Sequence, residues 1–166
     1  MNTARLARED VLRILGEVMD PEVPVISVVE LGIIRDVDVT AERVKISITP
    51  TYSGCPAMRT MEQDMRAALA ARGIADIEFE TVYSPAWTSD WIPAEAKEKL
   101  RRFGIAPPAP AEPGGLITLT RRPPAVACPY CGSANTERKS EFGSTACKAI
   151  HFCNACHQPF DEFKPF

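Results

Sequence analysis

The sequence predicts an α+β protein, with a small N-terminal domain of helix–strand–strand–helix–strand order followed by a C-terminal ribbon module built on paired cysteines. Helical and strand periods alternate over the first 82 residues, seven of the 15 prolines fall between Pro107 and Pro129, and five of the six cysteines lie in the last 39 residues. A chain of 166 residues with 45% hydrophobic and 25% charged residues is typical of a globular protein with one ordinary domain and a small appendage.

A helix, two strands and then a second helix are predicted over residues 4–73. The first helix spans 4–19, capped by Thr3 and ended by Asp20-Pro21, because the residue before proline is pushed out of helical geometry. Its apolar residues recur at helical spacing at Ala7, Val11, Ile14, Leu15 and Val18. Residues 33–39 and 44–48 alternate apolar and polar positions and predict a hairpin. The second helix carries a stripe of Met58, Met61, Met65 and Leu69 and is closed by Gly73.

A third strand is expected within 74–82, and a short helix from Pro93 to Gly104. The domains are therefore expected at 1–105 and 125–166, joined by a stiff proline-rich linker at 106–124. Within this linker the apolar run 116–119 is short enough to dock as an edge strand.

Two C-x-x-C knuckles predict a structural zinc site, with Cys128 and Cys131 in one and Cys153 and Cys156 in the other. Iron is the alternative metal, because four thiolates also bind a single iron ion. Cys147 and His151 lie four residues apart between the knuckles and would form an auxiliary ligand pair if that stretch were helical. Choosing them would split a matched knuckle, so Cys147 is kept as an auxiliary residue only.

Cys55 is the second candidate site. It follows a predicted strand, and Pro56 is expected at the first position of the next helix. Unsatisfied N–H groups at a helix N-terminus favour a thiolate. The alternative is a buried structural cysteine. Asp20 and Glu22 are candidate helpers, since two carboxylates and one thiolate suit iron, although acidic residues at such positions more often serve helix ends and turns.

The charge and hydropathy of the chain argue against nucleic-acid binding, membrane insertion and export. A formal net charge of −3 disfavours nucleic-acid binding, which usually relies on clustered Lys and Arg. No apolar stretch approaches the roughly 20 residues that cross a bilayer, and the first ten residues lack an export signal, so a cytoplasmic location without membrane contact is expected.

Several motifs resemble known families. The segments Asp20-Pro-Glu-Val-Pro, 29–35 and Gly54-Cys55-Pro56 resemble the small iron–sulfur assembly factors that include SufT, a resemblance that implies a compact α+β fold and a functional cysteine at Cys55. The segments 85–92, 141–148 and 159–164 are similar to the PaaD-type components of bacterial phenylacetyl-CoA epoxidase systems, and this similarity spans nearly the whole chain.

The resemblance implies a cytoplasmic maturation protein without catalysis of its own. Its partners would be the oxygenase or reductase subunits of that system, and Cys55 would handle iron or an iron–sulfur cluster transiently. Whether the chain forms a homodimer is left open. Two other hypotheses remain, a Cys55-dependent thiol enzyme and a nucleic-acid-binding ribbon. The first domain lacks histidine, so no Cys–His couple supports the enzyme.

Overall fold

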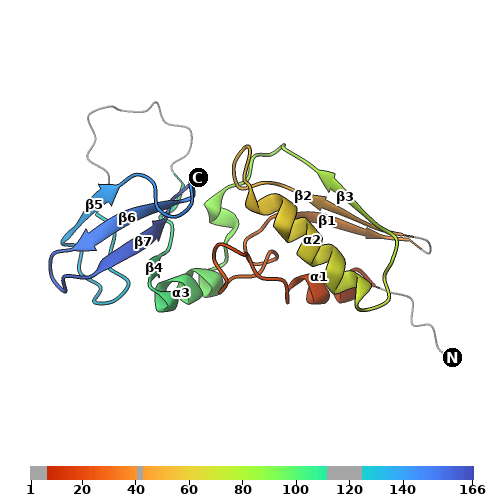
Figure 1. The fold of residues 1–166 in the computed structure, drawn as a ribbon, viewed down its shortest axis with the longest axis horizontal. Coiled ribbons are helices and arrows are strands. Elements are labelled where there is room, and N and C mark those ends of the chain that lie inside the picture. Colours follow the sequence, from red (N-terminus) through yellow and green to blue (C-terminus); the bar gives the residue numbers. More distant parts are fainter. Residues whose placement is uncertain (1–6, 41–42, 112–124) are drawn as a thin grey trace. The chain divides into compact units, whose positions relative to one another are not determined.

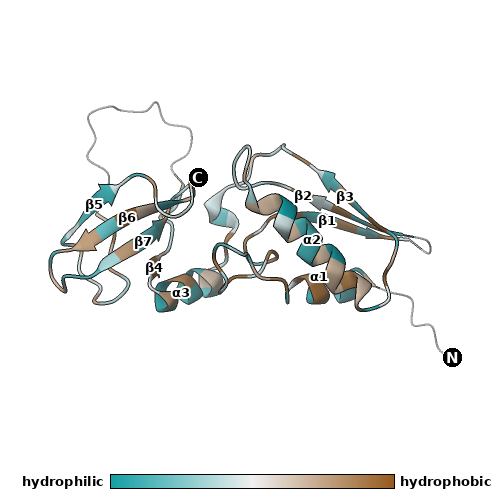
Figure 2. Ribbon diagram, in the orientation of Figure 1, coloured by the Kyte–Doolittle hydropathy of each residue, from teal (hydrophilic) through white to brown (hydrophobic). Residues whose placement is uncertain are grey.

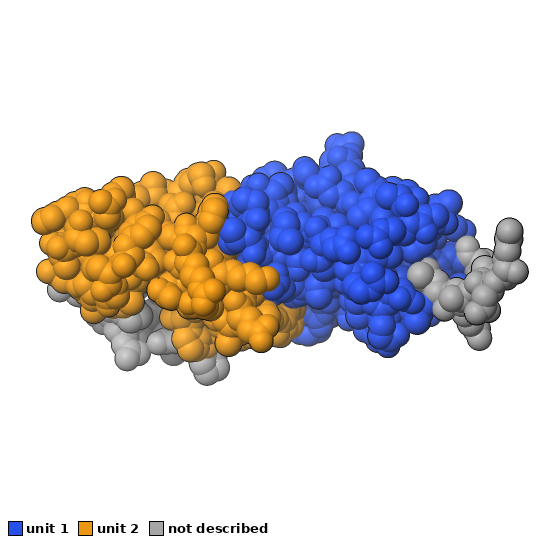
Figure 3. All heavy atoms as spheres, turned by 90° about the horizontal axis from the view of Figure 1, so that it is seen from below, with its two compact units in different colours: residues 1–87 blue, residues 88–166 orange. Residues whose placement is uncertain are grey.

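The computed structural model of the chain describes residues 7–40, 43–111 and 125–166. The chain divides into two compact units, Met1–Trp87 and Thr88–Phe166 (Figures 1 and 3). The first unit mixes helices with a small sheet and the second contains the ribbon with its cysteine cluster, so the predicted α+β class is confirmed.

Unit 1 is built on a three-stranded sheet of order β1-β2-β3, formed by β1 (Ile34–Val39), β2 (Val44–Ile48) and β3 (Ile77–Thr81). β1 and β2 form the predicted antiparallel hairpin, whereas β3 pairs with β2 in parallel. A parallel pair needs a crossover, and the helix α2 (Ala57–Ala70) supplies it (Figure 1). The point where β2 ends and α2 begins is therefore an end of the sheet from which loop residues project.

The helices α1 (Arg8–Leu15) and α2 contact each other, and α1 also contacts β1. Apolar and polar residues alternate along both helices (Figure 2), and the buried ones face the unit's core. The fully buried side chains include Leu15, Ile46, Met61, Met65 and Leu69. Met58, which the helical stripe also predicted as apolar core, is only half-buried.

The first helix is shorter than expected. Ala7 is its N-cap and Gly16 its C-cap, and the Asp10 carboxylate accepts a hydrogen bond from the backbone N–H of Ala7. The expected cap Thr3 lies outside the described residues. Beyond Gly16 the chain turns and Met19 pairs with Ser27 in an isolated bridge, so the helix ends before the Asp20-Pro21 stop.

Unit 2 contains a short 3-10 helix η1 (Ser89–Trp91), α3 (Ala94–Phe103) and a four-stranded sheet of order β4-β7-β6-β5. The strands are β4 (Ile105–Ala106), β5 (Thr136–Ser140), β6 (Lys148–Cys153) and β7 (Pro159–Phe163). β5, β6 and β7 are antiparallel neighbours, and β4 joins β7 in parallel. As predicted, α3 ends at Gly104, which adopts a left-handed conformation with φ of 90°.

The unit boundary lies earlier than the expected division after residue 105. Because β4 pairs with β7, α3 and β4 are counted with the ribbon, and the first unit ends at Trp87. Trp87 is buried in unit 1, where its indole N–H donates to the carbonyl of Leu31 at 2.9 Å. Most of the expected linker, residues 112–124 with the apolar run 116–119, lies outside the described residues.

The helices in the described part of the chain are too short or too polar to cross a bilayer.

Candidate metal centre and thiol site

Two tight turns carry the four knuckle cysteines. The first turn precedes β5, with the Gly132 N–H donating to the Cys128 carbonyl at 2.8 Å and Gly132 at φ of 76°. The second turn joins β6 to β7, with the His157 N–H donating to the Cys153 carbonyl at 2.9 Å. Each hydrogen bond closes a five-residue turn that contains both cysteines of one knuckle.

The four knuckle sulfurs converge on one point. The ligand atoms of Cys128, Cys131, Cys153 and Cys156 all lie within 4.8 Å of one another. The sulfurs of Cys128 and Cys156 are 3.7 Å apart and those of Cys131 and Cys153 are 3.6 Å apart. A tetrahedral site with zinc–sulfur bonds near 2.3 Å requires sulfur–sulfur separations of about 3.8 Å. The cluster therefore has the chemistry and spacing of a four-thiolate metal site.

The cluster is anchored in the core of the ribbon. Cys128 and Cys153 are buried and pack with Ala106 and Phe160, while Val126 and Cys156 are partly buried against them. Cys131 is exposed. One wall of the metal site is thus part of the apolar core that joins β4, β6 and β7, so a bound metal would be coupled to folding of this unit.

The thiols have unequal proton affinities before a metal binds. Hydrogen bonds from the backbone N–H of Cys156, and then of Ala155, lower the pKa of Cys153 to about 7 against the opposing effect of burial. Burial raises the pKa of Cys156 to about 12. The backbone N–H of Ser133 lowers the pKa of Cys131, but burial and the neighbouring thiols outweigh it and the pKa is raised. Metal binding must therefore release protons from this cluster.

Cys147 and His151 do not form the helical pair considered from the sequence. Residues 148–153 are strand β6, and neither residue belongs to the four-cysteine group. Cys147 is buried, and its sulfur lies 3.0 Å from the Thr145 hydroxyl oxygen. His151 is buried and stacks on Phe160, with ring centroids 5.4 Å apart.

Sequence reasoning missed a network of ionisable side chains around the buried Glu162 on the same sheet. His151 Nε2 lies 2.7 Å from Glu162 Oε2, and Arg138 Nη2 lies 3.3 Å from that same oxygen. These residues come from β6, β7 and β5 respectively. Their sequence separations carry no motif, and only the strand register, in which Arg138 faces His151, could have pointed to the network.

Cys55 lies in the turn between β2 and α2. Its carbonyl accepts a hydrogen bond from the Met58 N–H at 3.4 Å, and Pro56 is the N-cap of α2, one position earlier than the sequence suggested. The preceding Gly54 has φ of 82°, a conformation that glycine adopts without strain. The Cys55 side chain is half-exposed. The thiol is therefore accessible at the start of a helix.

Asp20 and Glu22 lie in the turn that follows α1. Asp20 is buried, and its Oδ1 accepts hydrogen bonds from the backbone N–H groups of Glu22 at 2.6 Å and Val23 at 3.0 Å. Within residues 7–40, 43–111 and 125–166, the knuckle cysteines alone form a group of three or more side chains placed to hold a metal. Asp20 thus acts as a turn-forming residue in this conformation, and the structure does not assemble it with Glu22 and Cys55.

Comparison with known proteins covers both units. Residues 8–78 match the iron–sulfur cluster assembly protein family, and residues 112–164 match the PaaD zinc beta ribbon domain. Over 94 residues the chain is 35% identical to an Fe-S protein maturation auxiliary factor of Porphyromonas gingivalis, covering 55% of this chain and 89% of that protein.

Solved structures resemble this chain over its assembly-type domain. A domain of unknown function, DUF59, from Bacillus anthracis has 27% identity and a TM-score of 0.53, covering 56% of this chain and 90% of that one. A conserved hypothetical protein from Thermotoga maritima has 30% identity and a TM-score of 0.51, covering 59% of this chain and 97% of that one.

One relative matches along almost the whole chain. A protein of Escherichia coli (strain K12), assigned as the D-type component of 1,2-phenylacetyl-CoA epoxidase, is 42% identical over 155 residues, covering 93% of this chain and 91% of that protein. With both units matched in one relative, the chain belongs to the PaaD family, that of the D-type epoxidase components.

Proposed function

We propose that this protein is an accessory component of a phenylacetyl-CoA epoxidase system in aerobic phenylacetate breakdown, acting in maturation of the metal centre or iron–sulfur cluster of the oxygenase or its reductase. The observation that carries the proposal is the union in one chain of an iron–sulfur-assembly domain with an accessible cysteine and a ribbon that closes four sulfurs on one point. The relative from Escherichia coli supports the choice of client system.

The two sulfur sites have different roles in this proposal. The ribbon cysteines hold a resident zinc ion that stabilises unit 2, because the sulfur spacing suits a closed tetrahedral site without an open position for substrate. Cys55 receives iron or a cluster as cargo and passes it on. A half-exposed thiol outside any ligand cluster suits transient ligation, whereas four converging ribbon thiols, two of them buried, suit permanent binding.

The residues around Cys55 present the thiol instead of completing a ligand cage. The left-handed Gly54 and the helix-starting Pro56 hold the turn in which the thiol lies. Further ligands for the cargo come from the client protein or from the movement of Asp20 and Glu22, whose turn lies in the same unit. An incomplete ligand set favours release, as delivery requires.

The remaining features are consistent with protein partners in the cytoplasm. The net charge of −3 gives little attraction for phosphate backbones. In this proposal the ribbon therefore binds the oxygenase or reductase and not nucleic acid. Both histidines are in unit 2, at positions 151 and 157, so unit 1 has no Cys–His couple to make Cys55 a catalytic nucleophile.

The central test is Cys55→Ser, supplied to cells that lack their own copy of the protein, with the iron content and epoxidation activity of the purified oxygenase and reductase as readouts. We expect both to fall at least tenfold, with the zinc content of the accessory protein unchanged. Ser53→Ala is the matched control, since Ser53 is an exposed residue of the same turn. Full iron loading with Cys55→Ser would refute the role of the thiol.

The metal assignment is tested by elemental analysis and absorption spectroscopy of anaerobically purified protein. We expect one zinc per chain and a colourless protein, with any iron lost on Cys55→Ser. Iron bound stoichiometrically and retained in the Cys55→Ser protein would instead identify the ribbon as the iron site.

A further inference from the structure

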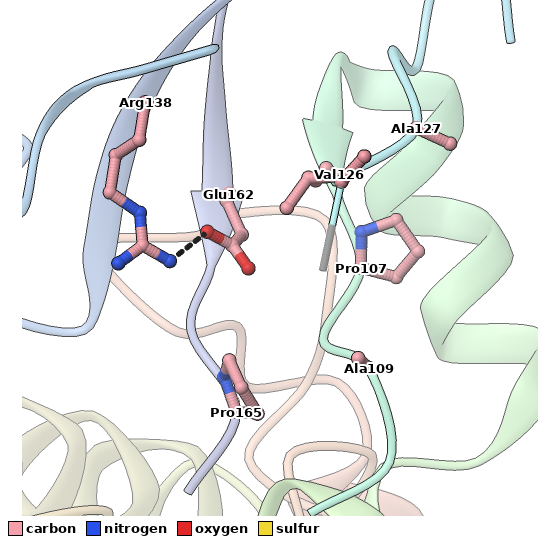
Figure 4. Close-up of a pocket in the computed structure, with 9 residues that line it drawn as sticks. Pro107, Ala109, Val126, Ala127, Arg138, Glu162 and Pro165 are labelled. Carbon is pink, nitrogen blue, oxygen red and sulfur yellow. Dashed lines mark hydrogen bonds and ion pairs between the residues drawn. The ribbon is translucent and has the colours of Figure 1, made fainter. Parts of the chain in front are cut away.

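Unit 2 contains a pocket of about 280 Å³ between the segment that begins with the short strand β4 and the ribbon (Figure 4). Its walls are mainly small apolar side chains, including Pro107, Ala109 and Val126. Arg138 and Glu162 form the polar side of the pocket. The volume lies just below the range of about 300 to 1,000 Å³ that is usual for small-molecule sites, so the occupant must be compact.

The polar side of this pocket is built around a buried carboxylate. The Glu162 side chain is only 4% exposed, and its Oε2 meets Arg138 on one side and His151 on the other. In Figure 4 the second carboxylate oxygen is turned away from Arg138, on the side that faces Pro107 and Pro165. No hydrogen bond in the described structure involves this second oxygen, Oε1.

The arginine partner of Glu162 is shared with a second carboxylate. Arg138 is shared, because its Nη1 lies 2.6 Å from Glu141 Oε2 while its Nη2 lies 3.3 Å from Glu162. One guanidinium thus serves two carboxylates. His151 Nε2 lies 2.7 Å from the same oxygen, Oε2, so both contacts are made to one carboxylate oxygen and Oε1 is left for another donor. The pocket therefore combines apolar walls with a buried carboxylate that shares its guanidinium partner and has one oxygen left to accept a hydrogen bond.

We propose that this pocket binds a compact aliphatic group that ends in an ammonium, such as a small alkylamine or the side chain of a lysine presented by a partner protein. The methylene chain would pack on the alanine and proline walls, and the ammonium would donate to Glu162 Oε1, a charge-assisted hydrogen bond away from bulk water. Neither the knuckle cysteines nor Cys55 line this pocket, so the proposal stands whether or not the maturation role is correct.

The test is a titration of the full-length, metal-loaded protein with n-butylammonium, followed by NMR of the alanine and valine methyl groups. We expect saturable shifts confined to the pocket methyls, including those of Ala109 and Val126. Butyrate, which has a similar chain and the opposite charge, should cause no saturable shift. The peptide acetyl-Gly-Lys-Gly-amide separates the two sources: tighter binding than butylammonium supports a partner's lysine, and weaker binding supports a small amine.

Two variants test the assignment independently. Glu162→Gln keeps the side chain's size but removes its charge, and should weaken butylammonium binding at least tenfold. If Glu162→Gln lowers the metal content, Ala109→Leu provides the decisive result, because this exposed position fills the pocket without entering the core. Butylammonium binding that is unchanged in Ala109→Leu, or equal binding of butyrate and butylammonium by the natural protein, would overturn the proposal.

Discussion

Replacing Gly104 by alanine should destabilise unit 2 through both the backbone and a neighbouring side chain. Gly104 caps α3 with φ of 90°, where an L residue is strained. A Cβ added there would lie 2.6 Å from the Tyr130 hydroxyl oxygen and 3.0 Å from Cζ. Tyr130 belongs to the first knuckle, so the strain would reach the loop that carries Cys128 and Cys131.

The two contributions can be separated in magnitude. The left-handed backbone costs an alanine about 1–2 kcal/mol, offset by about 0.4–1 kcal/mol because alanine restricts the unfolded chain. Tyr130 is 58% exposed, so its ring can turn away into solvent. With about 200 Å² for a tyrosine side chain and ~25 cal/mol per Å², losing all of its buried contact would cost at most about 2 kcal/mol. The expected total is about 1–3 kcal/mol.

Gly73→Ala is the matched control. Gly73 has φ of 84° just after α2, and a Cβ there meets nothing within 4 Å, so it carries the backbone cost alone. Hydrogen exchange followed by mass spectrometry reports the opening free energy of each unit separately in the full-length protein. We expect Gly104→Ala to lower protection of α3 and the first knuckle by more than Gly73→Ala lowers that of α2.

A double-mutant cycle with Tyr130→Ala completes the test. In the Tyr130→Ala background, Gly104→Ala should cost only the backbone amount, about 0–1.6 kcal/mol. Equal costs of Gly104→Ala with and without the Tyr130 ring would show that the ring does not oppose the added methyl group.

Three further predictions concern the core, the metal and a surface lysine. Met65→Ala, at a fully buried position of α2, should lower the free energy of unfolding of unit 1 by about 2–5 kcal/mol, against less than about 1 kcal/mol for the half-buried Met58→Ala, both measured by urea denaturation. Removing the metal with a chelator at neutral pH should abolish hydrogen-exchange protection in β5–β7 but leave β1–β3 protected, since structural zinc contributes on the order of 10 kcal/mol in such modules; retained protection in β5–β7 would refute the metal's structural role. The hydrogen bond from Lys45 to Glu80 raises the pKa of the lysine above its ordinary 10.5. The stabilising effect of this hydrogen bond is therefore complete below pH 10.5 and is lost as the pH rises through the folded-state pKa. Glu80→Gln should lower the pKa of Lys45 measured in an NMR titration.

Local patterns predicted the elements that depend on neighbouring residues. The stripe that ends in Met61, Met65 and Leu69 predicted α2 because its apolar residues recur every three or four positions and are buried on one side. The α3 helix ended at Gly104 as expected, since a left-handed cap is a property of one residue. The helix expected over residues 4–19 was predicted too long, since it spans Arg8–Leu15 and Met19 instead pairs with Ser27 in an isolated bridge.

Pairings between distant segments could not be predicted in this way. Nothing in the stretch 74–82 indicates that β3 runs parallel to β2, or that β4, next to the proline-rich segment, joins β7. Each such pairing depends on which apolar faces meet when the whole unit packs. The position of the unit boundary follows from the second pairing.

By itself, the sequence determined the four-sulfur site. Two cysteines separated by two residues lie in one tight turn, and two such turns can together bind a single metal ion. It also marked Cys55 as the thiol at the start of a helix. Only the tertiary structure decided that Cys147 and His151 are strand residues apart from the cluster, that Asp20 caps a turn, and that Glu162 is buried between Arg138 and His151 beside a pocket. Those contacts join residues far apart along the chain, and they exist only once the strands have taken their register.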